Sequence, residues 1–386
     1  MNTDKLQWKL MHDDAITLND RKQMCEFILS NKKLSYGEKV KEFEKKWSEW
    51  QGCKYSVFVN SGSSANLLIV QAAHDLYGHG NWLAQSCTWS TNVAPILQLK
   101  HNSSGLYLTD TDLFTLGPNI DQLKKYILEF NIKYIFLTHL LGIPAISDIL
   151  LELCEKNNII LFEDCCESHG STWKNKKVGT FGKAASFSFF YGHHITTIEG
   201  GMICTDDENL YYHLLLLRSH GLLRELPDSE KQKRKILDID ERFTFLCPGY
   251  NLRNTDLHAV LGIEQMKRLE SAVTIREKNF KYYLNKLNKD KYISDFNSEG
   301  VSLFAFPIIT KNKNIKKIIE LLNYNRIDNR PLIAGNLFRH PMMNSVNTFR
   351  NDKVSNFIHD NGLYVGNNEF VTENDIDRLT FLLNSI

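Results

Sequence analysis

The chain has 386 residues, of which 42% are hydrophobic and 24% are charged, and its formal net charge is +1. This composition is ordinary for a globular protein and leaves room for two domains with a sizeable core. Lys and Arg are scattered without a basic block, and no apolar run approaches the roughly 20 residues that a bilayer span requires. Neither nucleic acid nor a membrane is therefore expected as a partner.

The eight cysteines form no Cys-x-x-Cys pair, and the amino terminus lacks the apolar core of a signal peptide. Cys165 and Cys166 are adjacent, so on a strand they would point to opposite faces and could not share a metal ion. We interpret the cysteines as reduced core residues of a cytoplasmic protein, and we expect no metal site.

The first part of the chain alternates between helical and strand-like segments. Residues 1–30 are expected to be helical and polar, and a second helix is predicted where Val40, Phe43 and Trp47 repeat with the spacing of one helix face. Residues 55–59 form a β-rich run, which precedes a small-residue turn, 60–66, and an apolar helix over 67–76. Strand, tight turn and helix in succession are typical of an α/β unit.

The alternation continues through the middle of the chain. Strands are predicted at 106–108, 134–137, 159–164, 186–191 and 201–204, with helices at 120–130 and 149–154. Apolar strands separated by helices favour a mainly parallel sheet covered by helices on both faces. Beyond Gly249 a helical stretch rich in Lys and Glu, 255–295, precedes a predicted strand at 301–309. We therefore predict a large domain over residues 1–254 and a smaller α+β domain over 255–386.

Three segments carry the polar residues of a candidate pocket. The turn Ser61–Asn66 opens a helix, where free backbone N–H groups bind phosphate, although such a turn is more often a plain N-cap. Asp164 ends an apolar strand, where a buried carboxylate needs a partner, and an ordinary salt-bridged acid is an equally good interpretation. The third segment, 186–201, is an apolar run that ends in polar residues and a paired glycine, as at the end of a strand beside a pocket.

Together these segments resemble the DegT/DnrJ/EryC1/StrS-type family of pyridoxal-phosphate sugar aminotransferases, which act on nucleotide-linked keto-sugars. The resemblance extends over nearly the whole chain and includes the segments Glu163–Gly170, Thr88–Thr91 and Pro248–Arg253. It implies fold type I (aspartate aminotransferase-like), pyridoxal 5′-phosphate or pyridoxamine 5′-phosphate as cofactor, and a homodimer with shared active sites. The residues that it implies for cofactor binding are Gly62, Ser63, Ser64, Trp89, Asp164, Glu167, Ser188 and Asn251.

The resemblance also implies a role for each of these residues. Ser188 joins the small residues of the turn at the cofactor phosphate, and Asp164 pairs with the protonated pyridine nitrogen, which keeps the ring an electron sink. Glu167 falls near the ring hydroxyl, where aminotransferases carry Gln or His. Trp89 stacks on the ring, although a tryptophan considered alone is more often a core residue. Asn251 reaches into the active site of the neighbouring subunit.

The cofactor lysine of this family normally precedes a His/Asn-Ile-Thr-Thr-x-Glu-Gly-Gly segment, and here His193 takes that position. A histidine can move protons but cannot form a stable Schiff base. The pyridoxamine form can then persist, so that a hydroxyl beside the keto carbon is expelled instead of an amine being transferred. The resemblance therefore implies a glutamate-dependent C3 dehydration of a nucleotide-linked 4-keto-6-deoxyhexose. GDP-4-keto-6-deoxy-D-mannose is the expected substrate, and His193 is the expected catalytic residue.

Four further residues are candidates for binding the sugar nucleotide or L-glutamate. Arginine binds both diphosphates and carboxylates in a bidentate manner, although most arginines are surface charges. Two of the candidates fall within motifs that the resemblance covers, Gly-Tyr-Asn-Leu-Arg and Arg-Pro. The candidates are His220, Arg224, Arg253 and Arg330.

Other interpretations stay open at this point. The alternatives are a nucleotide-sugar 4-aminotransferase, which the missing lysine argues against, and a catalytically silent regulator that binds sugar on a PLP fold. Lys183 is the nearest lysine, but it begins the strand whose other end meets the pocket. A related iron–sulfur type acting on a CDP-sugar needs four thiolates, and only Cys247 follows residue 204. His169, where we expect an apolar residue, and Gly192 depart from the expected pattern and leave the nucleotide base and the sugar stereochemistry open.

Overall fold

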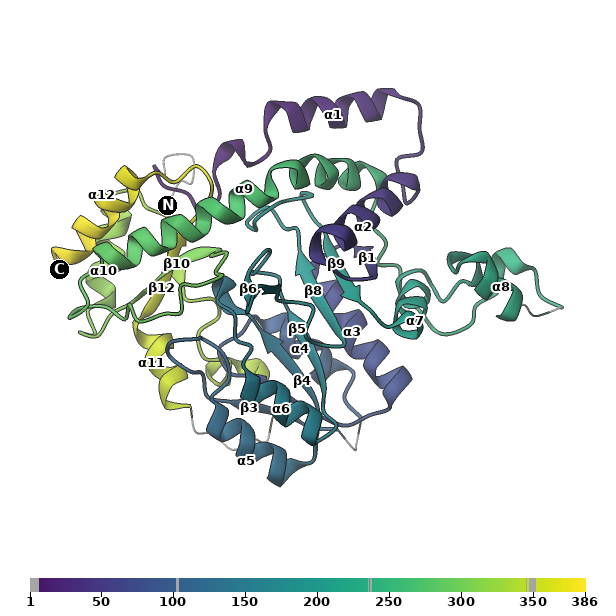
Figure 1. Ribbon diagram of the computed structural model, residues 1–386, viewed down its shortest axis with the longest axis horizontal. Coiled ribbons are helices and arrows are strands. Elements are labelled where there is room, and N and C mark those ends of the chain that lie inside the picture. The colour runs from purple at the N-terminus through teal and green to yellow at the C-terminus, as the bar shows by residue number, and fades with distance from the viewer. Residues whose placement is uncertain (1–6, 102–103, 235, 237, 345, 347–351) are drawn as a thin grey trace.

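The computed structural model describes residues 7–101, 104–234, 236, 238–344, 346 and 352–386. A seven-stranded sheet lies at its centre, in the order β1-β9-β8-β5-β4-β2-β3 (Figure 1). Its strands are β1 (Tyr55–Val59), β2 (Asn81–Gln85), β3 (Leu106–Thr109), β4 (Ile132–Thr138), β5 (Ile160–Asp164), β8 (Ala184–Ser188) and β9 (Gly201–Thr205). β9 runs antiparallel to β1 and β8, and the other neighbours pair in parallel. The mainly parallel sheet expected from the sequence is therefore confirmed.

Helices cover both faces of this sheet, because successive side chains of each strand point to opposite sides. In β1, Val57 and Val59 pack into a core built largely with α3 (Gly62–Tyr77) and α7 (Glu208–Arg218). Phe58, between them, packs instead with α2 (Glu38–Gln51), where its ring lies 5.0 Å from that of Phe43. Further α-helices of this part are α1 (Leu18–Leu29), α4 (Ser90–Gln98), α5 (Ile120–Phe130) and α6 (Asp148–Lys156).

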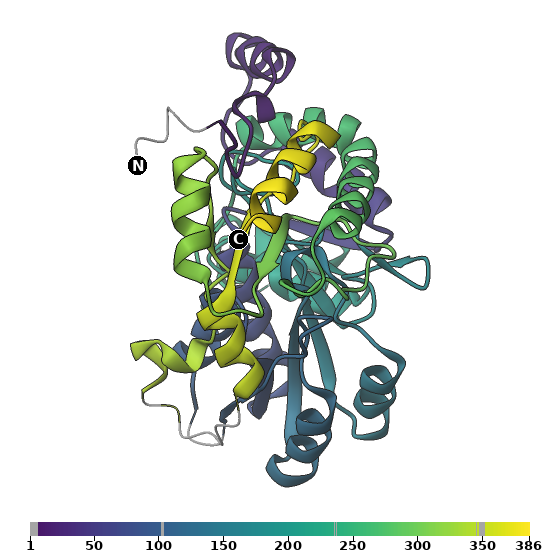
Figure 2. The ribbon, with the colours of Figure 1, turned by 90° about the vertical axis from the view of Figure 1, so that its left-hand side faces the viewer.

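The carboxy-terminal part has its own three-stranded antiparallel sheet and core. Its elements are β10 (Ala305–Ile309), α10 (Ile315–Tyr324), β11 (Arg330–Pro331), α11 (Lys353–Asn361), β12 (Gly362–Gly366) and α12 (Glu373–Asn384). Figure 2 shows these light green and yellow elements beside the central sheet, with α1 in purple at the top of the view. The long helix α9 (Asp256–Lys286) packs against α1 and α2 and also against α12. The domain boundary expected at residue 255 stays a prediction.

Two smaller features extend from this framework. A short hairpin, β6 (Thr172–Trp173) and β7 (Lys176–Lys177), follows the end of β5. The segment η4 (Leu223–Glu225), α8 (Asp228–Arg234) and η5 (Glu241–Phe243) projects away from the body, to the right in Figure 1. Within the described residues no helix is both long and apolar enough to cross a membrane.

Several predicted boundaries are wrong, and each has a local cause. After a single 3-10 turn, η2 (Asp13–Ala15), the first α-helix begins only at Leu18, because Thr17 caps it in a reciprocal pair of hydrogen bonds with Asp20. Residues 1–6 lie outside the described part. The strand expected to reach Tyr191 ends at Ser188, because the chain turns back when the His193 N–H donates to the carbonyl of Phe190.

The carboxy-terminal boundaries shift in the same way. The helix expected over 255–295 ends at Lys286, and the strand expected from 301 begins at Ala305. Phe304 just before that strand donates its N–H to Leu141, in a different part of the chain. The cysteines are free thiols, but Cys25 is exposed and is therefore not the core residue that we expected.

Candidate active site

A cavity of about 310 Å³ lies at the carboxyl ends of three neighbouring strands of the central sheet. Thr138, Asp164 and Ser188, the last residues of β4, β5 and β8, line it. Ligand sites of open α/β sheets lie at this edge, because the carboxyl ends of parallel strands converge there. The predicted site residues that the cavity brings together are Gly62, Ser63, Trp89, Asp164, Glu167, Ser188, His193 and Arg330.

The beginning of helix α3 forms one wall of the cavity. The Ser61 hydroxyl accepts a hydrogen bond from the N–H of Ser64 at 3.0 Å and so caps the helix. Gly62 has no space for a side chain, since a Cβ there would lie 2.7 Å from Cβ of Ser188 and 2.9 Å from Sγ of Cys166. The backbone N–H groups at the start of this 16-residue helix and the Ser188 hydroxyl therefore meet in one place. Such a set of donors, with the helix dipole, suits a phosphate group.

Asp164 is held in the cavity wall by three neutral donors. Its carboxylate accepts hydrogen bonds from Nδ2 of Asn66 at 2.9 Å, from Nδ2 of Asn92 at 3.4 Å and from the N–H of Cys166 at 3.1 Å. These donors orient the carboxylate without neutralising it, so the cavity retains a site for a protonated nitrogen. The ordinary salt-bridged acid considered from the sequence is therefore not what the structure shows for this residue.

Glu167 lies in the same cavity but differs in its protonation. Burial raises the pKa of its carboxyl group to about 8, and the nearby charge of Asp164 acts in the same direction. The N–H of Leu141 donates to its Oε2 at 2.7 Å and partly offsets this effect. Near neutral pH the Glu167 carboxyl group therefore holds a proton that it can donate to a ligand oxygen.

His193 follows β8 in the loop that returns to β9, and its ring lines the cavity. Its Nδ1 is shielded from solvent and has no hydrogen-bond partner among the described residues. Burial, together with the nearby guanidinium of Arg276, lowers the pKa of His193 to about 4. The imidazole is therefore neutral at physiological pH and can accept a proton. No lysine is among the described residues that line the cavity.

Trp89 and Arg330 line the outer part of the cavity. The Trp89 side chain is 51% exposed at the start of α4, so it is not a core residue and presents its ring to a ligand. Arg330 lies 3.8 Å from the carboxylate of Asp328, and 53% of its side chain is exposed. Aromatic, anion-binding, acidic and proton-donating groups thus converge in one space. This donor set fits a pyridoxal-phosphate-type cofactor, which carries a phosphate, a ring nitrogen and a ring hydroxyl.

Three residues predicted for the site, His220, Asn251 and Arg253, lie together outside the cavity. His220 follows α7, and the other two lie in the loop before α9. Nε of Arg253 donates to Oδ1 of Asn251 at 3.2 Å, and its Nη2 lies 3.4 Å from Nε2 of His220. Ser64 is also absent from the described cavity lining, because its N–H and hydroxyl are bonded to Ser61.

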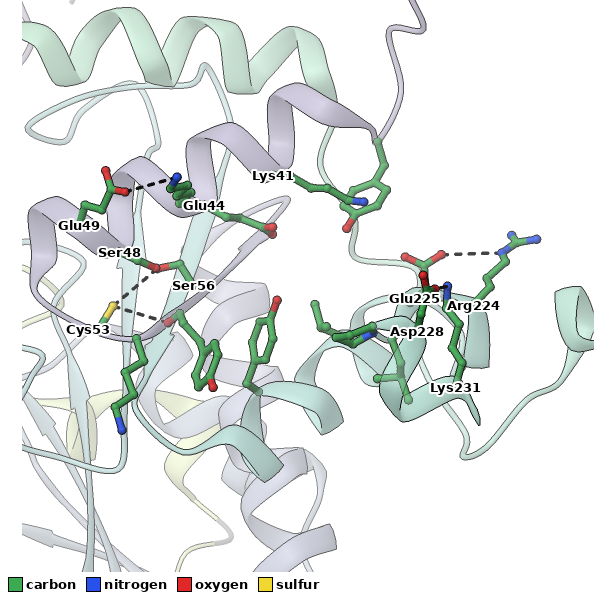
Figure 3. Close-up of a pocket in the computed structure, with 18 residues that line it drawn as sticks. Lys41, Glu44, Ser48, Glu49, Cys53, Ser56, Arg224, Glu225, Asp228 and Lys231 are labelled. Carbon is green, nitrogen blue, oxygen red and sulfur yellow. Dashed lines mark hydrogen bonds and ion pairs between the residues drawn. The ribbon is translucent and has the colours of Figure 1, made fainter. Parts of the chain in front are cut away.

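Arg224 belongs to a different hollow, an open groove of about 880 Å³ between α2, α7 and the start of α8. Figure 3 shows its guanidinium beside Glu225, with Nε 3.8 Å from the carboxylate. Within this chain Arg224 therefore does not contact the cavity.

Several residues in or beside the cavity had no expected role of their own. Within the turn Ser61–Asn66, Ser61 lines the wall where Ser64 was expected, and Tyr364 enters from β12. Asn66 and Asn92 support Asp164 from two helices, α3 and α4. A polar residue on an otherwise apolar helix face was the available signal for Asn66. Tyr364 comes from the distant carboxy-terminal sheet, and no role in the site was expected for it from the sequence.

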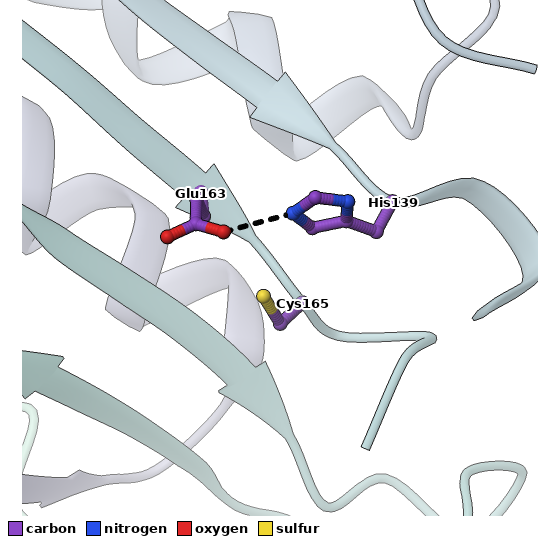
Figure 4. Close-up of side chains that lie close together, drawn as sticks. All are labelled: His139, Glu163 and Cys165. Atoms are coloured by element: carbon purple, nitrogen blue, oxygen red, sulfur yellow. Dashed lines mark hydrogen bonds and ion pairs between the residues drawn. The ribbon is translucent and has the colours of Figure 1, made fainter. Parts of the chain in front are cut away.

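A second buried polar cluster adjoins the site and has a structural role. Figure 4 shows Nε2 of His139 directed at Glu163, 3.0 Å from its Oε2, with Cys165 beside the pair. Nδ1 of His139 accepts the N–H of Ala145, and the Glu163 carboxylate accepts three N–H groups from the turn at 179–182. These bonds already occupy both imidazole nitrogens and both carboxylate oxygens. The cluster therefore fixes this turn and the loop after β4 to the end of β5, next to Asp164.

Comparison with known proteins agrees with this architecture. The chain matches the DegT/DnrJ/EryC1/StrS aminotransferase family over residues 16–381 and belongs to that family. It is 36% identical over 371 residues to GDP-4-keto-6-deoxy-D-mannose 3-dehydratase of Escherichia coli O55:H7, covering 92% of this chain and 94% of that protein. The protein of the same name from Yersinia pseudotuberculosis is 34% identical over 377 residues, covering 92% and 93%.

Solved structures of proteins with the same name are also similar to this chain. A crystal structure of GDP-4-keto-6-deoxymannose-3-dehydratase with a trapped PLP-glutamate geminal diamine superposes with a TM-score of 0.90 at 33% identity, covering 98% of this chain and 100% of that one. An aminotransferase from Psychrobacter cryohalolentis, at 21% identity and a TM-score of 0.83, shares the fold. The pyridoxal-phosphate aminotransferase fold expected from the sequence is therefore confirmed.

Proposed function

We propose that the chain is a pyridoxal phosphate/pyridoxamine phosphate- and glutamate-dependent 3-dehydratase of a nucleotide-linked 4-keto-6-deoxyhexose, GDP-4-keto-6-deoxy-D-mannose. The observation that carries this proposal is the presence of His193, and of no lysine, among the described residues lining the cavity. An aminotransferase of this fold needs the lysine amine, whereas a dehydratase needs only a base. The relatives named as 3-dehydratases over 92% of the chain support the same activity.

We propose that different residues of the cavity bind different groups of the cofactor. The N–H groups of Gly62 and Ser63 and the Ser188 hydroxyl would hold the phosphate, and Asp164 would pair with the ring nitrogen. Glu167 would donate to the ring hydroxyl, and Trp89 would cover the ring face. When bound, pyridoxamine phosphate supplies a primary amine for the sugar ketone and a ring that accepts electrons.

His193 would do the proton chemistry at the sugar. A neutral imidazole, which burial favours here, accepts a proton at the cavity and returns it to the hydroxyl that leaves C3. Arg330, at the outer part of the cavity, would bind a carboxylate or a phosphate of the substrates.

The overall reaction balances with glutamate as the reductant. Replacing the C3 hydroxyl by hydrogen takes two electrons, which glutamate supplies as it becomes 2-oxoglutarate. The hydroxyl oxygen leaves as water, one water molecule is consumed in forming 2-oxoglutarate, and the glutamate nitrogen leaves as ammonia. No external reductant is required.

We further propose a homodimer in which each subunit completes the active site of the other. The side chains of His220, Asn251 and Arg253 form a partly exposed cluster outside their own cavity, in which Arg253 contacts the other two. The projecting segment around α8 carries exposed apolar side chains at Ile236, Ile239 and Phe243, which a second subunit would cover. The eight free thiols support the expected cytoplasmic location, where thiols stay reduced.

The test is mass spectrometry of GDP-4-keto-6-deoxy-D-mannose after incubation with the protein, pyridoxal phosphate and glutamate. A product lighter by one oxygen atom, formed together with 2-oxoglutarate, supports the dehydratase. A product in which an amine replaces the ketone identifies a 4-aminotransferase and overturns the proposal. An unchanged sugar and unchanged glutamate, with cofactor bound, indicate a silent regulator. The CDP-linked sugar serves as the control for the nucleotide base.

A further inference from the structure

Three imidazoles lie together behind the cavity. The ring of His169, which is fully buried, is centred 4.9 Å from that of His194 and 6.3 Å from that of His193. The rings of Trp47 and Phe189 enclose His169 at 5.5 and 5.6 Å. His169 is therefore a polar side chain in an aromatic cage, at a position where the sequence analysis expects an apolar residue.

Four nitrogen atoms of these rings have no hydrogen-bond partner among the described residues. They are both nitrogens of His169, Nδ1 of His193 and Nδ1 of His194, and all are shielded from solvent. Leaving a buried polar atom unsatisfied is unfavourable, so such atoms are normally bonded to each other or to buried water. Four of them in three adjacent rings indicate a shared hydrogen-bond network.

The direction of this network is set at one end by a backbone carbonyl. Nε2 of His194 lies 2.9 Å from the carbonyl oxygen of Ser302, which can only accept, so this nitrogen carries the hydrogen. Burial lowers the pKa of all three histidines, and Arg276 on α9, itself beside Glu369, lowers them further. Each ring is therefore neutral, with one donor and one acceptor, and Nδ1 of His194 must be an acceptor.

The positions of the other ring hydrogens are inferred from this hydrogen bond between His194 and Ser302. The ring of His194 is closer to His169 than that of His193, so in such a network the N–H of His169 would serve Nδ1 of His194, and the other nitrogen of His169 would be an acceptor. The 6.3 Å between the ring centres of His169 and His193 exceeds the roughly 5 Å of a direct imidazole bond and suits one bridging water. Nδ1 of His193 can donate to that water, which donates in turn to the acceptor nitrogen of His169, and Nε2 of His193 then carries no hydrogen.

We propose that His169 is a positioning residue that, with His194 and the Ser302 carbonyl, fixes His193 in the tautomer with a hydrogen on Nδ1 and a free Nε2. A general base needs its unprotonated nitrogen at the cavity, so this tautomer is the competent one. The proposal rests on the proposed function for the role of His193. The tautomer itself is a property of the folded chain and exists without substrate.

The experiment measures that tautomer directly, by long-range proton–nitrogen NMR correlation on nitrogen-15 histidine-labelled protein without substrate. The His193 signals are those lost in His193→Gln. In the wild type we expect Nδ1 protonated and Nε2 bare, and in His169→Phe a mixture of tautomers. In the same variant the rate of deoxysugar formation should fall about ten-fold or more, with KM within about two-fold. His169→Gln keeps a donor and an acceptor and should retain the tautomer and most of the rate.

Phe189→Leu is the matched control, because it alters the same aromatic cage without touching a nitrogen; it should leave the His193 tautomer unchanged. The proposal is overturned if His169→Phe, or His169→Leu where the former does not fold, keeps the wild-type His193 tautomer. It is also overturned if the wild type carries the hydrogen on Nε2. Failure of the proposed function would appear separately, as an unchanged sugar despite the expected tautomer.

Discussion

Nδ2 of Asn66 lies 2.9 Å from Oδ2 of Asp164, so a helix side chain holds the carboxylate at the end of β5. Both residues are buried, with exposed fractions of 1% and 3%. Removing the Asn66 amide leaves the Asp164 carboxylate with two donors, Nδ2 of Asn92 at 3.4 Å and the N–H of Cys166 at 3.1 Å. The folded state is then less stable, because a buried charge is less well satisfied.

Asn66→Ala is expected to lower the free energy of unfolding by about 1–3 kcal/mol, the usual range for a lost buried hydrogen bond. Urea denaturation followed by circular dichroism measures it. Gln23→Ala on α1 is the control, because its Nε2 donates to Glu26 at the surface. The control should change stability by less than about 1 kcal/mol, and equal effects of the two variants would contradict the buried role of Asn66.

Glu167→Gln is expected to change the pH dependence of stability. The pKa of this carboxyl group is raised from 4.5 to about 8 in the folded chain, so the folded state holds its proton more tightly. The stability that this proton contributes is complete below pH 4.5 and is lost as the pH rises through about 8. The free energy of unfolding should thus fall with rising pH by about 1–4 kcal/mol more in the wild type than in the variant.

Denaturant titrations across that pH range measure this difference. The lowered pKa of His193 makes the free energy of unfolding rise between about pH 4 and pH 6.5. This effect is the same in the wild type and the variant, so it cancels in the difference. Glu155→Gln, at an exposed position of α6, should run parallel to the wild type. A parallel curve for Glu167→Gln as well would show that Glu167 titrates normally.

His193→Asn is expected to reduce the rate of deoxysugar formation by about 10²–10⁴-fold, the contribution of a positioned acid–base group. Its affinity for the nucleotide sugar should stay within about three-fold of the wild type, because the side chain forms only a small part of the cavity wall. Rapid-mixing kinetics and isothermal titration calorimetry measure the two quantities. A loss confined to affinity would mean that His193 binds the sugar and does not move protons.

Gly62→Ala is expected to weaken cofactor binding by about ten-fold or more. Its Cβ would lie 2.7 Å from Cβ of Ser188 and must displace the hydroxyl proposed to hold the phosphate. Gly192 lines the same cavity, but a Cβ there would lie 3.7 Å from its nearest neighbour, the ring of Phe190. Gly192→Ala is therefore the matched control. Fluorescence titration with pyridoxal phosphate distinguishes them, and similar affinities would place the phosphate elsewhere.

Coexpression of His193→Asn with Asn251→Ala tests the shared active sites. Each variant alone should be nearly inactive. If subunits pair at random, half of the dimers are mixed and one of their two sites has both intact residues, so about one quarter of the wild-type activity should return. Isolated heterodimers with no activity above the two parents would show that Asn251 acts within its own subunit or not at all.

Local patterns predicted much of this structure. The strand, turn and helix over residues 55–77 are encoded by a β-rich run, small capping residues and an apolar helix, so they could be predicted within a few positions. The convergence of Asp164 and Ser188 follows from parallel strands. The bond of Asn66 to Asp164 joins residues 98 positions apart, and such pairing depends on packing that no local pattern specifies. For the same reason Tyr364 and the cage around His169 were not predicted.

Helix α9 packs against helices of both parts of the protein. Its 31 residues span about 46 Å at 1.5 Å per residue, with one end packed on α1 and α2 and the other on α12. Gly262 lets it approach α2 so closely that a Cβ would lie 2.6 Å from the ring of Phe43. Separating the two sheets would require bending this helix. Substrate entry is therefore expected to leave the distance between the two sheets unchanged.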